Sequence, residues 1–138
     1  MTRINKCTFK KNVAFYAACF AFTVTLFVAL AVTGHVYPFG DNSFLAGDLK
    51  YQYIDFFAWF RRVLLGEENL RYSFSQGLGM NTWGLYSYYL ASPFNLLCVL
   101  FPKDKLTLFV FVIAALKLGC IHISSAWFLQ KRFGLPKP

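Results

Sequence analysis

The chain alternates between apolar and polar segments in the order apolar, polar, apolar. The first apolar run is Val13–Thr33 and the second is Leu106–Leu129, with the polar segment His35–Lys105 between them. At a rise of about 1.5 Å per residue, a helix over either run is about as long as a hydrocarbon core of roughly 30 Å is thick. We therefore predict two transmembrane helices, over residues 13–34 and 106–129.

A cleaved signal peptide is the alternative interpretation of the first run. Such peptides have an apolar region of roughly 7–15 residues followed by a small-residue cleavage site. The run here is longer and no clean Ala-x-Ala-like site follows it. The pattern therefore favours a membrane anchor.

Within the polar segment, Asp48–Leu65 has the periodicity of an amphipathic helix. Asp48, Gln52 and Asp55 share a polar side, and Gly66 can end the helix. The apolar stripe consists of Leu49, Tyr53, Phe56, Phe60, Val63 and Leu64. We predict an interfacial helix that lies on the outer leaflet with its aromatic side down.

The second half of the polar segment, Trp83–Phe101, is aromatic and apolar and is broken by Ser92-Pro93. Either half is too short to span a bilayer, so a re-entrant or surface helix pair is expected. Tyr88 and Tyr89 fit an aromatic belt at the membrane interface, or could line a sugar or lipid groove. The predicted fold class is an all-α membrane protein, with two transmembrane helices joined by a large external loop, residues 35–105, that carries amphipathic or interfacial helices.

Composition supports a membrane environment. Aromatic residues make up 20% of the chain and charged residues only 14%, against roughly 25% charged in soluble domains. A soluble chain of this size could not bury so many aromatic side chains, so membrane lipid is an expected partner.

The net charge of +8 lies entirely in the flanks of the chain. Residues 35–105 hold all six acidic residues and six basic ones. In residues 1–34 and 106–138 every charged residue is basic. Basic flanks outside apolar spans follow the positive-inside rule. We therefore predict a multi-pass protein of the plasma membrane, with cytoplasmic basic termini at residues 1–12 and 130–138, and we expect no nucleic-acid partner.

Lys117 lies in the middle of the second apolar run. A lysine there costs about 2.5–3.5 kcal/mol on insertion scales. Snorkelling is the simplest interpretation, but the nearest interface is ~15 Å away, half of the core thickness, which is too far for a lysine stem. Lys117 is therefore interpreted as an intramembrane polar contact with other protein or a wet cavity. The first run offers no carboxylate, so the partner is expected in another subunit or in further transmembrane helices.

The row Asp48, Gln52 and Asp55 has the spacing i, i+4, i+7, which lines up three oxygen-bearing groups on a helix. Such a row could hold a divalent cation, or one aspartate could take a proton from an attacking hydroxyl. The competing interpretation is the solvated side of an amphipathic helix. Asp41 falls in a segment, Pro38–Asn42, that reads as a turn.

Several motifs resemble, in order and spacing, the start of YfhO-type bacterial membrane proteins, over roughly residues 10–135. They are Tyr37-Pro38-Phe39-Gly40-Asp41, Gly47-Asp48, Gln52-Tyr53, Tyr72-Ser73-Phe74-Ser75, Gly77-Leu78-Gly79 and Tyr88-Tyr89-Leu90-Ala91-Ser92-Pro93-Phe94-Asn95. YfhO-type proteins look like C-type (GT-C) glycosyltransferases, which take a sugar from a polyprenyl-phosphate carrier outside the membrane. Some are linked to glycosylation of lipoteichoic acid or related envelope polymers.

The resemblance also implies roles for individual residues. The superfamily carries an essential aspartate in its first external loop, which acts as a general base or helps to place a metal ion. Asp48 matches that position and Asp41 is the second candidate, with Gln52 and Asp55 as supporting groups. Metal dependence stays open, and a divalent cation is one possible cofactor.

Family members have many spans, and this chain has two predicted ones. The resemblance therefore implies an N-terminal part of the enzyme that is inactive alone, with the carrier-phosphate site completed by later spans. The alternative is a small non-catalytic membrane protein that assembles with partner subunits through Lys117. A transporter or flippase fragment is a third, weaker interpretation, because intramembrane lysines also mark transport pathways.

Overall fold

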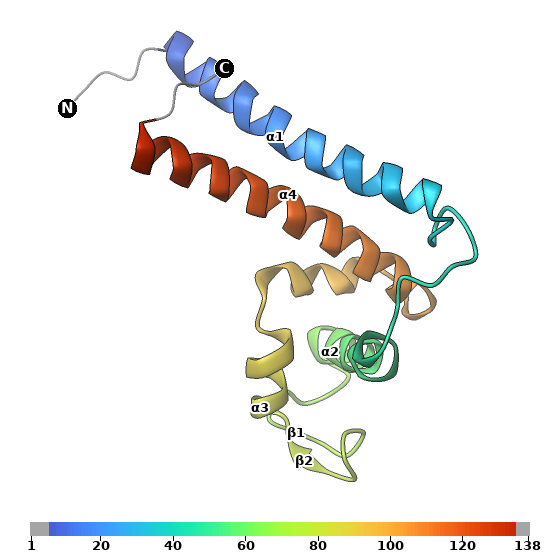
Figure 1. Cartoon of the computed structure of the whole chain (residues 1–138). Helices are drawn as coiled ribbons and strands as arrows, with labels where there is room; N and C mark the ends of the chain where they lie inside the picture. Colours follow the sequence, from blue (N-terminus) through green and yellow to red (C-terminus); the bar gives the residue numbers. More distant parts are fainter. Residues whose placement is uncertain (1–5, 135–138) are drawn as a thin grey trace, which may run out of the picture. The chain divides into compact units, whose positions relative to one another are not determined.

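The structure is a computed structural model that describes residues 6–134, with side chains from Asn12 onward. The outer ends of the two predicted cytoplasmic segments, residues 1–5 and 135–138, lie outside the described residues. In chain order the elements are α1 (Lys6–Thr33), η1 (Leu49–Tyr53), α2 (Ile54–Leu64), β1 (Tyr72–Ser73), β2 (Met80–Asn81), α3 (Trp83–Leu85), η2 (Tyr86–Leu90), η3 (Pro93–Leu100), η4 (Lys103–Lys105) and α4 (Leu106–Phe133) (Figure 1).

The chain divides into two units, which we name the helix pair and the connecting unit. The helix pair consists of α1 with the part of α4 from Ala114 onward, and the connecting unit is Val36–Ile113. Long α4 therefore contributes its first turns to the connecting unit and the rest to the helix pair.

Both predicted apolar helices are present. The segments Asn12–Thr33 and Lys103–Phe133 are long and apolar enough to cross a membrane. Each helix extends beyond its predicted span, since α1 begins at Lys6 and α4 continues to Phe133. The end of α4 is set by Gly134, which adopts a left-handed backbone (φ +61°) as glycines after helices commonly do.

The two long helices run side by side in opposite directions (Figure 1). The Tyr16 hydroxyl donates to Gln130 Oε1 at 2.8 Å, and Thr23 Oγ1 contacts His122 Nδ1 at 2.5 Å. Polar bonds between apolar helices are a common way to fix helix packing in membranes. Tyr16 and Thr23 of α1 are in this way paired with Gln130 and His122 of α4.

The connecting unit has its own apolar core, made where α2, η2, η3 and the first turns of α4 meet. Trp59 and Phe109 are fully buried there. The rings of Phe57 and Phe109 meet edge to face with centroids 5.1 Å apart, a preferred geometry for aromatic pairs. The rest of the core is Phe60, Leu85, Leu90, Cys98, Leu106, Val110 and Ile113.

The predicted amphipathic helix Asp48–Leu65 exists as one continuous helical stretch, Asp48–Leu64. Its apolar stripe does not lie open to lipid as expected. Phe60 is buried, and Tyr53, Phe56 and Val63 pack against the core of the connecting unit. The reason is that the apolar segment Trp83–Leu100 folds against this side of the helix and covers it with protein.

That apolar segment forms the expected pair of helical pieces on either side of Pro93. Asn95, which is buried, fixes the corner between them: its Nδ2 donates to the carbonyl oxygens of Leu90 at 3.2 Å and Tyr89 at 3.4 Å. The motif residue Asn95 thus satisfies backbone groups that would otherwise lose their hydrogen bonds where η2 ends.

One short antiparallel hairpin departs from the predicted all-α fold. Strands β1 and β2 pair with Tyr72 opposite Asn81 and Ser73 opposite Met80. Gly77, Leu78 and Gly79 all have positive φ, at 54°, 65° and 105°. Because glycine adopts such angles without steric cost, the Gly-x-Gly motif makes the turn that closes the hairpin.

Candidate functional site

Two π-helical segments meet in the connecting unit, and both carry predicted site residues. Segment η1 (Leu49–Tyr53) follows Asp48 and contains Gln52, and segment η2 (Tyr86–Leu90) contains Tyr88 and Tyr89. The two segments touch through Tyr53 and Tyr89, whose ring centroids lie 5.2 Å apart at 84°. Since π-helical turns are rare and occur often at functional sites, this juxtaposition defines the candidate site.

Asp48 opens the helical stretch, and Gly47 places it there. Gly47 has a left-handed backbone (φ +53°), and its carbonyl oxygen accepts the N–H of Lys50 at 3.0 Å and of Tyr51 at 3.3 Å. Asp48 is exposed, and its side chain makes no capping hydrogen bond to the helix. The Gly47-Asp48 motif therefore presents a carboxylate to solvent at a helix start.

Gln52 and Asp55 share a hollow of about 300 Å³, which we name the Gln52 hollow. Arg62 and Lys103 bring positive charge to the same hollow, whose other polar lining residues are Tyr51, Ser75 and Gln76. Asp48 does not line it. The predicted row of three oxygen-bearing groups is thus split between this hollow and the start of the helix.

The separation of Asp48 from Gln52 and Asp55 matters for the divalent cation that the sequence analysis gave as a possible cofactor. Among the residues that the structure describes, no three of the types His, Cys, Asp and Glu gather closely enough to hold a metal ion. The divalent cation as a cofactor stays a prediction.

Asp41 lies in the turn predicted for it. The Tyr37 N–H donates to the Asn42 carbonyl at 2.9 Å, and the Phe39 N–H to the Val36 carbonyl at 2.8 Å. Asp41 itself is exposed. The turn is attached to the start of α4 by aromatic rings, since Phe39 and Phe44 each meet Phe111 edge to face.

Tyr88 and Tyr89 occupy different environments. Tyr89 packs against Phe56 with ring centroids 5.1 Å apart, as well as against Tyr53. Tyr88 is 81% exposed and touches Tyr89 at 4.6 Å between centroids. Tyr89 therefore helps to position the π-helical segments, while Tyr88 presents a ring to the surroundings.

Lys117 belongs to the helix pair, whereas the residues described above belong to the connecting unit. Its side chain is partly exposed, and among residues 12–134 it makes neither an ion pair nor a hydrogen bond. Its partner, predicted to lie in another subunit or span, stays a prediction.

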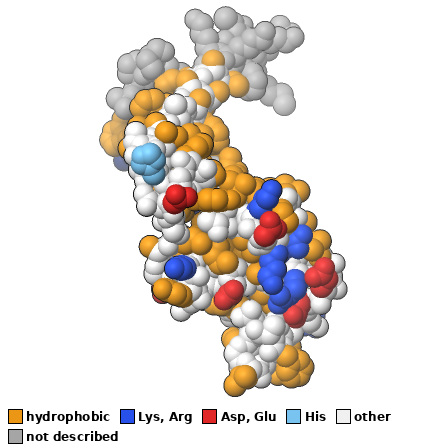
Figure 2. All heavy atoms as spheres, turned by 90° about the vertical axis from the view of Figure 1, so that its right-hand side faces the viewer, with side chains coloured by type: hydrophobic (Ala, Val, Ile, Leu, Met, Phe, Trp, Pro, Cys, Tyr) orange, Lys and Arg blue, Asp and Glu red, His pale blue; other side chains and the backbone are white. Residues whose placement is uncertain are grey.

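Sequence reasoning missed a second polar cluster, centred on Glu68. Ser73 Oγ donates to Glu68 Oε2 at 3.0 Å, Ser75 Oγ donates to Glu68 Oε1 at 3.1 Å, and Arg62 Nη2 lies 3.4 Å from Glu68 Oε1. Basic and acidic side chains lie close together on the face of the connecting unit in Figure 2. The one available signal was the motif Tyr72-Ser73-Phe74-Ser75, for which the sequence suggested no role.

Burial also changes the chemistry of one thiol in the connecting unit. Cys98 is fully buried in η3, and this burial raises its pKa from 9.0 to about 11, although the positive charge of Arg61 works in the opposite direction. Arg61 Nε donates to the Phe101 carbonyl at 2.7 Å and so ties α2 to the end of η3. Cys98 is therefore a core residue of the connecting unit.

Two helices that are long and apolar enough to cross a bilayer, with a helical unit between them in the chain, fit the class of helical membrane proteins. A profile of the family described as "Bacterial membrane protein YfhO" matches residues 18–137. The chain therefore belongs to the YfhO family of bacterial membrane proteins, as the motifs predicted. No curated protein and no solved structure matches the chain.

Proposed function

We propose that this chain contributes to a membrane glycosyltransferase that moves a sugar from a polyprenyl-phosphate carrier to a cell-envelope polymer such as lipoteichoic acid. The observation that carries the proposal is the pairing of the two π-helical segments. Motif residues that the family resemblance linked to catalysis and substrate binding, Asp48, Gln52 and Tyr88 among them, lie in or next to these segments and are exposed.

The proposal assigns a side of the membrane to the connecting unit. Basic residues flank the apolar helices and the connecting unit is nearly neutral, so the positive-inside rule orients both termini toward the cytoplasm. The connecting unit then lies outside the plasma membrane, where enzymes of this kind use lipid-linked sugars.

In the proposed reaction Asp48 is the general base. It accepts the proton of an acceptor hydroxyl as the hydroxyl oxygen bonds to the anomeric carbon of the sugar, and the carrier phosphate leaves with the electrons of the broken bond. An exposed carboxylate that is not held in a capping bond is available for this transfer. Asp41 is the second candidate for the base.

The Gln52 hollow supports the same reaction by position. Gln52 and Asp55 offer hydrogen-bonding groups one and two turns along from Asp48, and Arg62 and Lys103 bring positive charge beside them. We propose that these cations favour the charged carrier phosphate, together with groups from the other spans of the enzyme.

The test replaces Asp48 by Asn in the chromosomal gene, with every other codon unchanged. A general base contributes about 10²–10⁴-fold to rate, so the sugar carried per unit of envelope polymer should fall at least about 100-fold if transfer limits it. Asp104→Asn, which removes an exposed acid of η4 outside the site, is the matched control and should retain wild-type sugar content. Normal sugar content in cells with Asp48→Asn would remove Asp48 from the mechanism.

A second function, of a non-catalytic membrane protein that assembles with partner subunits, is favoured by Lys117 alone. A lysine in an apolar helix with no partner among the described residues is expected to meet one in another helix. This alternative predicts that Lys117→Leu abolishes co-purification of a membrane partner, while Asp48→Asn leaves every sugar content unchanged.

A further inference from the structure

The hairpin displays an aromatic pair that the function proposed above does not use. Tyr72 and Phe74 are 46% and 80% exposed, and their ring centroids lie 5.1 Å apart at 79°. Residues two apart in a strand point to the same side, so β1 and the residue after it present both rings together. They form an aromatic surface near the hairpin's end, which lies lowest in Figure 1 and carries apolar side chains in Figure 2.

Gly79 leaves the space that these rings occupy. A Cβ atom at Gly79 would lie 2.6 Å from Tyr72 Oη and 3.2 Å from Phe74 Cδ1. Its φ of +105° is also one that other residues rarely adopt. Because Gly79 has no side chain, the two rings can lie against its backbone. This contact leaves both rings exposed.

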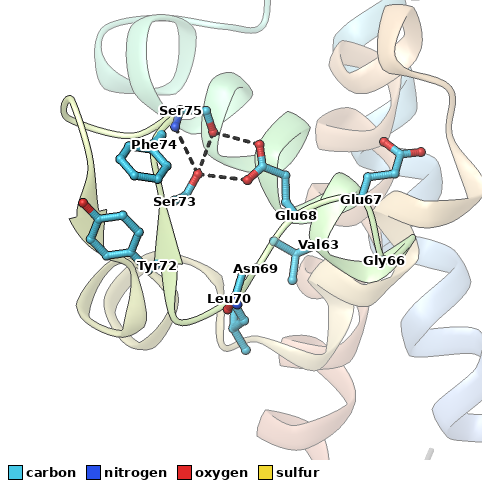
Figure 3. A pocket seen from close by; sticks show the side chains of 10 residues that line it. All are labelled: Val63, Gly66, Glu67, Glu68, Asn69, Leu70, Tyr72, Ser73, Phe74 and Ser75. Carbon is cyan, nitrogen blue, oxygen red and sulfur yellow. Dashed lines mark hydrogen bonds between the residues drawn. The ribbon is translucent and has the colours of Figure 1, made fainter.

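The other side of the same strand fixes a carboxylate. Ser73 is buried, bonds to Glu68 Oε2, and lies 2.7 Å from Ser75 Oγ; Ser75 bonds to Glu68 Oε1. Figure 3 shows this network beside the two rings. Glu68 is thus held at a defined place relative to the aromatic pair, because both depend on one short strand.

These groups line one open hollow of about 1230 Å³, which we name the Glu68 hollow. Glu67 and Asn69 add further oxygen and amide groups to its lining. It adjoins the Gln52 hollow, since Ser75 lines both and Arg62 bridges from one to Glu68 in the other. Aromatic surface bordered by a few fixed polar groups is the usual composition of a ligand site.

We infer that the Glu68 hollow binds a neutral saccharide, with Tyr72 and Phe74 against the C–H face of a sugar ring and Glu68, Glu67 and Asn69 bonded to its hydroxyl groups. The inference rests on the proposed function and names a binding site for its sugar.

The chemistry of the lining disfavours other ligands. An acyl chain would cover the carboxylates and the amide without bonding to them, which is costly. An anionic group such as phosphate would meet two carboxylates, of which Glu68 is paired with Arg62 and Glu67 has no ion pair among the described residues. A sugar ring presents both an apolar face and hydroxyl donors, so it satisfies both parts of the hollow.

The test measures binding by isothermal titration calorimetry, with the purified full chain in nanodiscs. The probes are a panel of neutral oligosaccharides of hexoses and N-acetylhexosamines, with oligomeric glycerol phosphate as the anionic probe. At least one neutral oligosaccharide should bind, and Phe74→Ala should raise its Kd about tenfold. Phe74→Tyr and Tyr72→Phe keep the rings and should bind as wild type does, which separates ring loss from misfolding.

Leu100→Ala is the matched control, since Leu100 is 74% exposed on η3 and does not line the hollow. Its Kd should equal that of the wild type. No binding by any neutral oligosaccharide, binding by glycerol phosphate alone, or an unchanged Kd with Phe74→Ala would each overturn the inference.

The same measurement separates this inference from the proposed function. Asp48→Asn should leave saccharide binding unchanged, because Asp48 lies outside the hollow. If Asp48→Asn removes sugar from the envelope polymer while no saccharide binds the chain, the inference fails and the proposed function stands. If a saccharide binds but Asp48→Asn changes no sugar content, the assignment of Asp48 fails and the binding site stands.

Discussion

Asn95 and Asp48 come from the same set of family motifs but differ in their surroundings. Asn95 is buried and bonds to two backbone carbonyls, so its role is to hold the corner after η2. Asp48 is exposed and makes no capping bond, so the fold does not need its carboxylate for that purpose. This difference is the reason that we propose a chemical role for Asp48 and a structural one for Asn95.

We expect burial to control the reactivity of the Cys98 thiol. Because its pKa is raised to about 11, the thiol stays protonated at neutral pH and should be alkylated far more slowly than a free thiol. The folded chain is treated with iodoacetamide at pH 8 and then digested, and mass spectrometry of its peptides should find Cys98 unmodified. The same treatment of the unfolded chain should modify Cys98.

The same pKa sets a direction for stability. Between pH 9.0 and about 11 the unfolded thiol has lost its proton while the folded one keeps it. The folded state then binds more protons, so the contribution of this group to stability falls as the pH rises through that window. Alkylation of Cys98 in the folded chain at a rate equal to that of the unfolded chain would contradict the assignment.

Sequence reasoning reached some site residues and missed others for a physical reason. Helical spacing places Asp55 and Gln52 on one side of a helix, and in the structure both residues line one hollow. The contacts of Glu68 with Ser73 and Ser75 depend on how a short hairpin folds back, which no simple period encodes. Ser73 and Ser75 are five and seven residues from Glu68 in the sequence, and neither helical nor strand periodicity predicts contacts at these spacings across a bend.

At the scale of elements, the sequence predicted where helices lie better than what covers them. The stretch Asp48–Leu64 ends within one residue of its predicted end, because a periodic stripe and Gly66 mark it clearly. Amphipathicity shows that one side is apolar but not whether lipid or protein covers it, and here protein does. The π-helical turns η1 and η2 were also unpredicted, since no residue pattern distinguishes them from α-helical turns.

The helices α1 and α4 pack closely where Gly119 meets Phe20. A Cβ atom at Gly119 would lie 2.5 Å from two carbons of the Phe20 ring. Gly119→Ala should therefore destabilise the helix pair by about 1–3 kcal/mol, even though alanine is the better helix former by about 1 kcal/mol. The free energy of unfolding, measured by SDS titration in mixed micelles, reports the change.

The control and the rescue use the same chain. Gly84 in α3 has open space where its Cβ would lie, so Gly84→Ala should leave stability unchanged or raise it. Adding Phe20→Leu to Gly119→Ala should restore part of the loss by freeing the space. A helix pair that is stabilised by Gly119→Ala would show that the two helices do not pack as described.

At the scale of the whole molecule, the segment between the two apolar helices folds as a unit that carries every acidic residue of the chain. Membership of the YfhO family fits that organisation. The proposed function, with its base, its carrier and its saccharide, requires that the connecting unit lie outside the plasma membrane. The charge pattern predicts this external location, and the proposed function depends on it.

Labelling of intact cells with a membrane-impermeant maleimide reports on which side of the membrane the connecting unit lies. Two single substitutions, Ser87→Cys in the connecting unit and Lys131→Cys near the end of α4, place thiols at exposed positions, in a background with Cys7→Ser; the background chain alone serves as the blank. We predict that Ser87→Cys is labelled in intact cells, and that Lys131→Cys is labelled only after the membrane is permeabilised. Labelling of Lys131→Cys in intact cells, with Ser87→Cys protected until permeabilisation, would place Asp48 on the cytoplasmic side and rule out the proposed function.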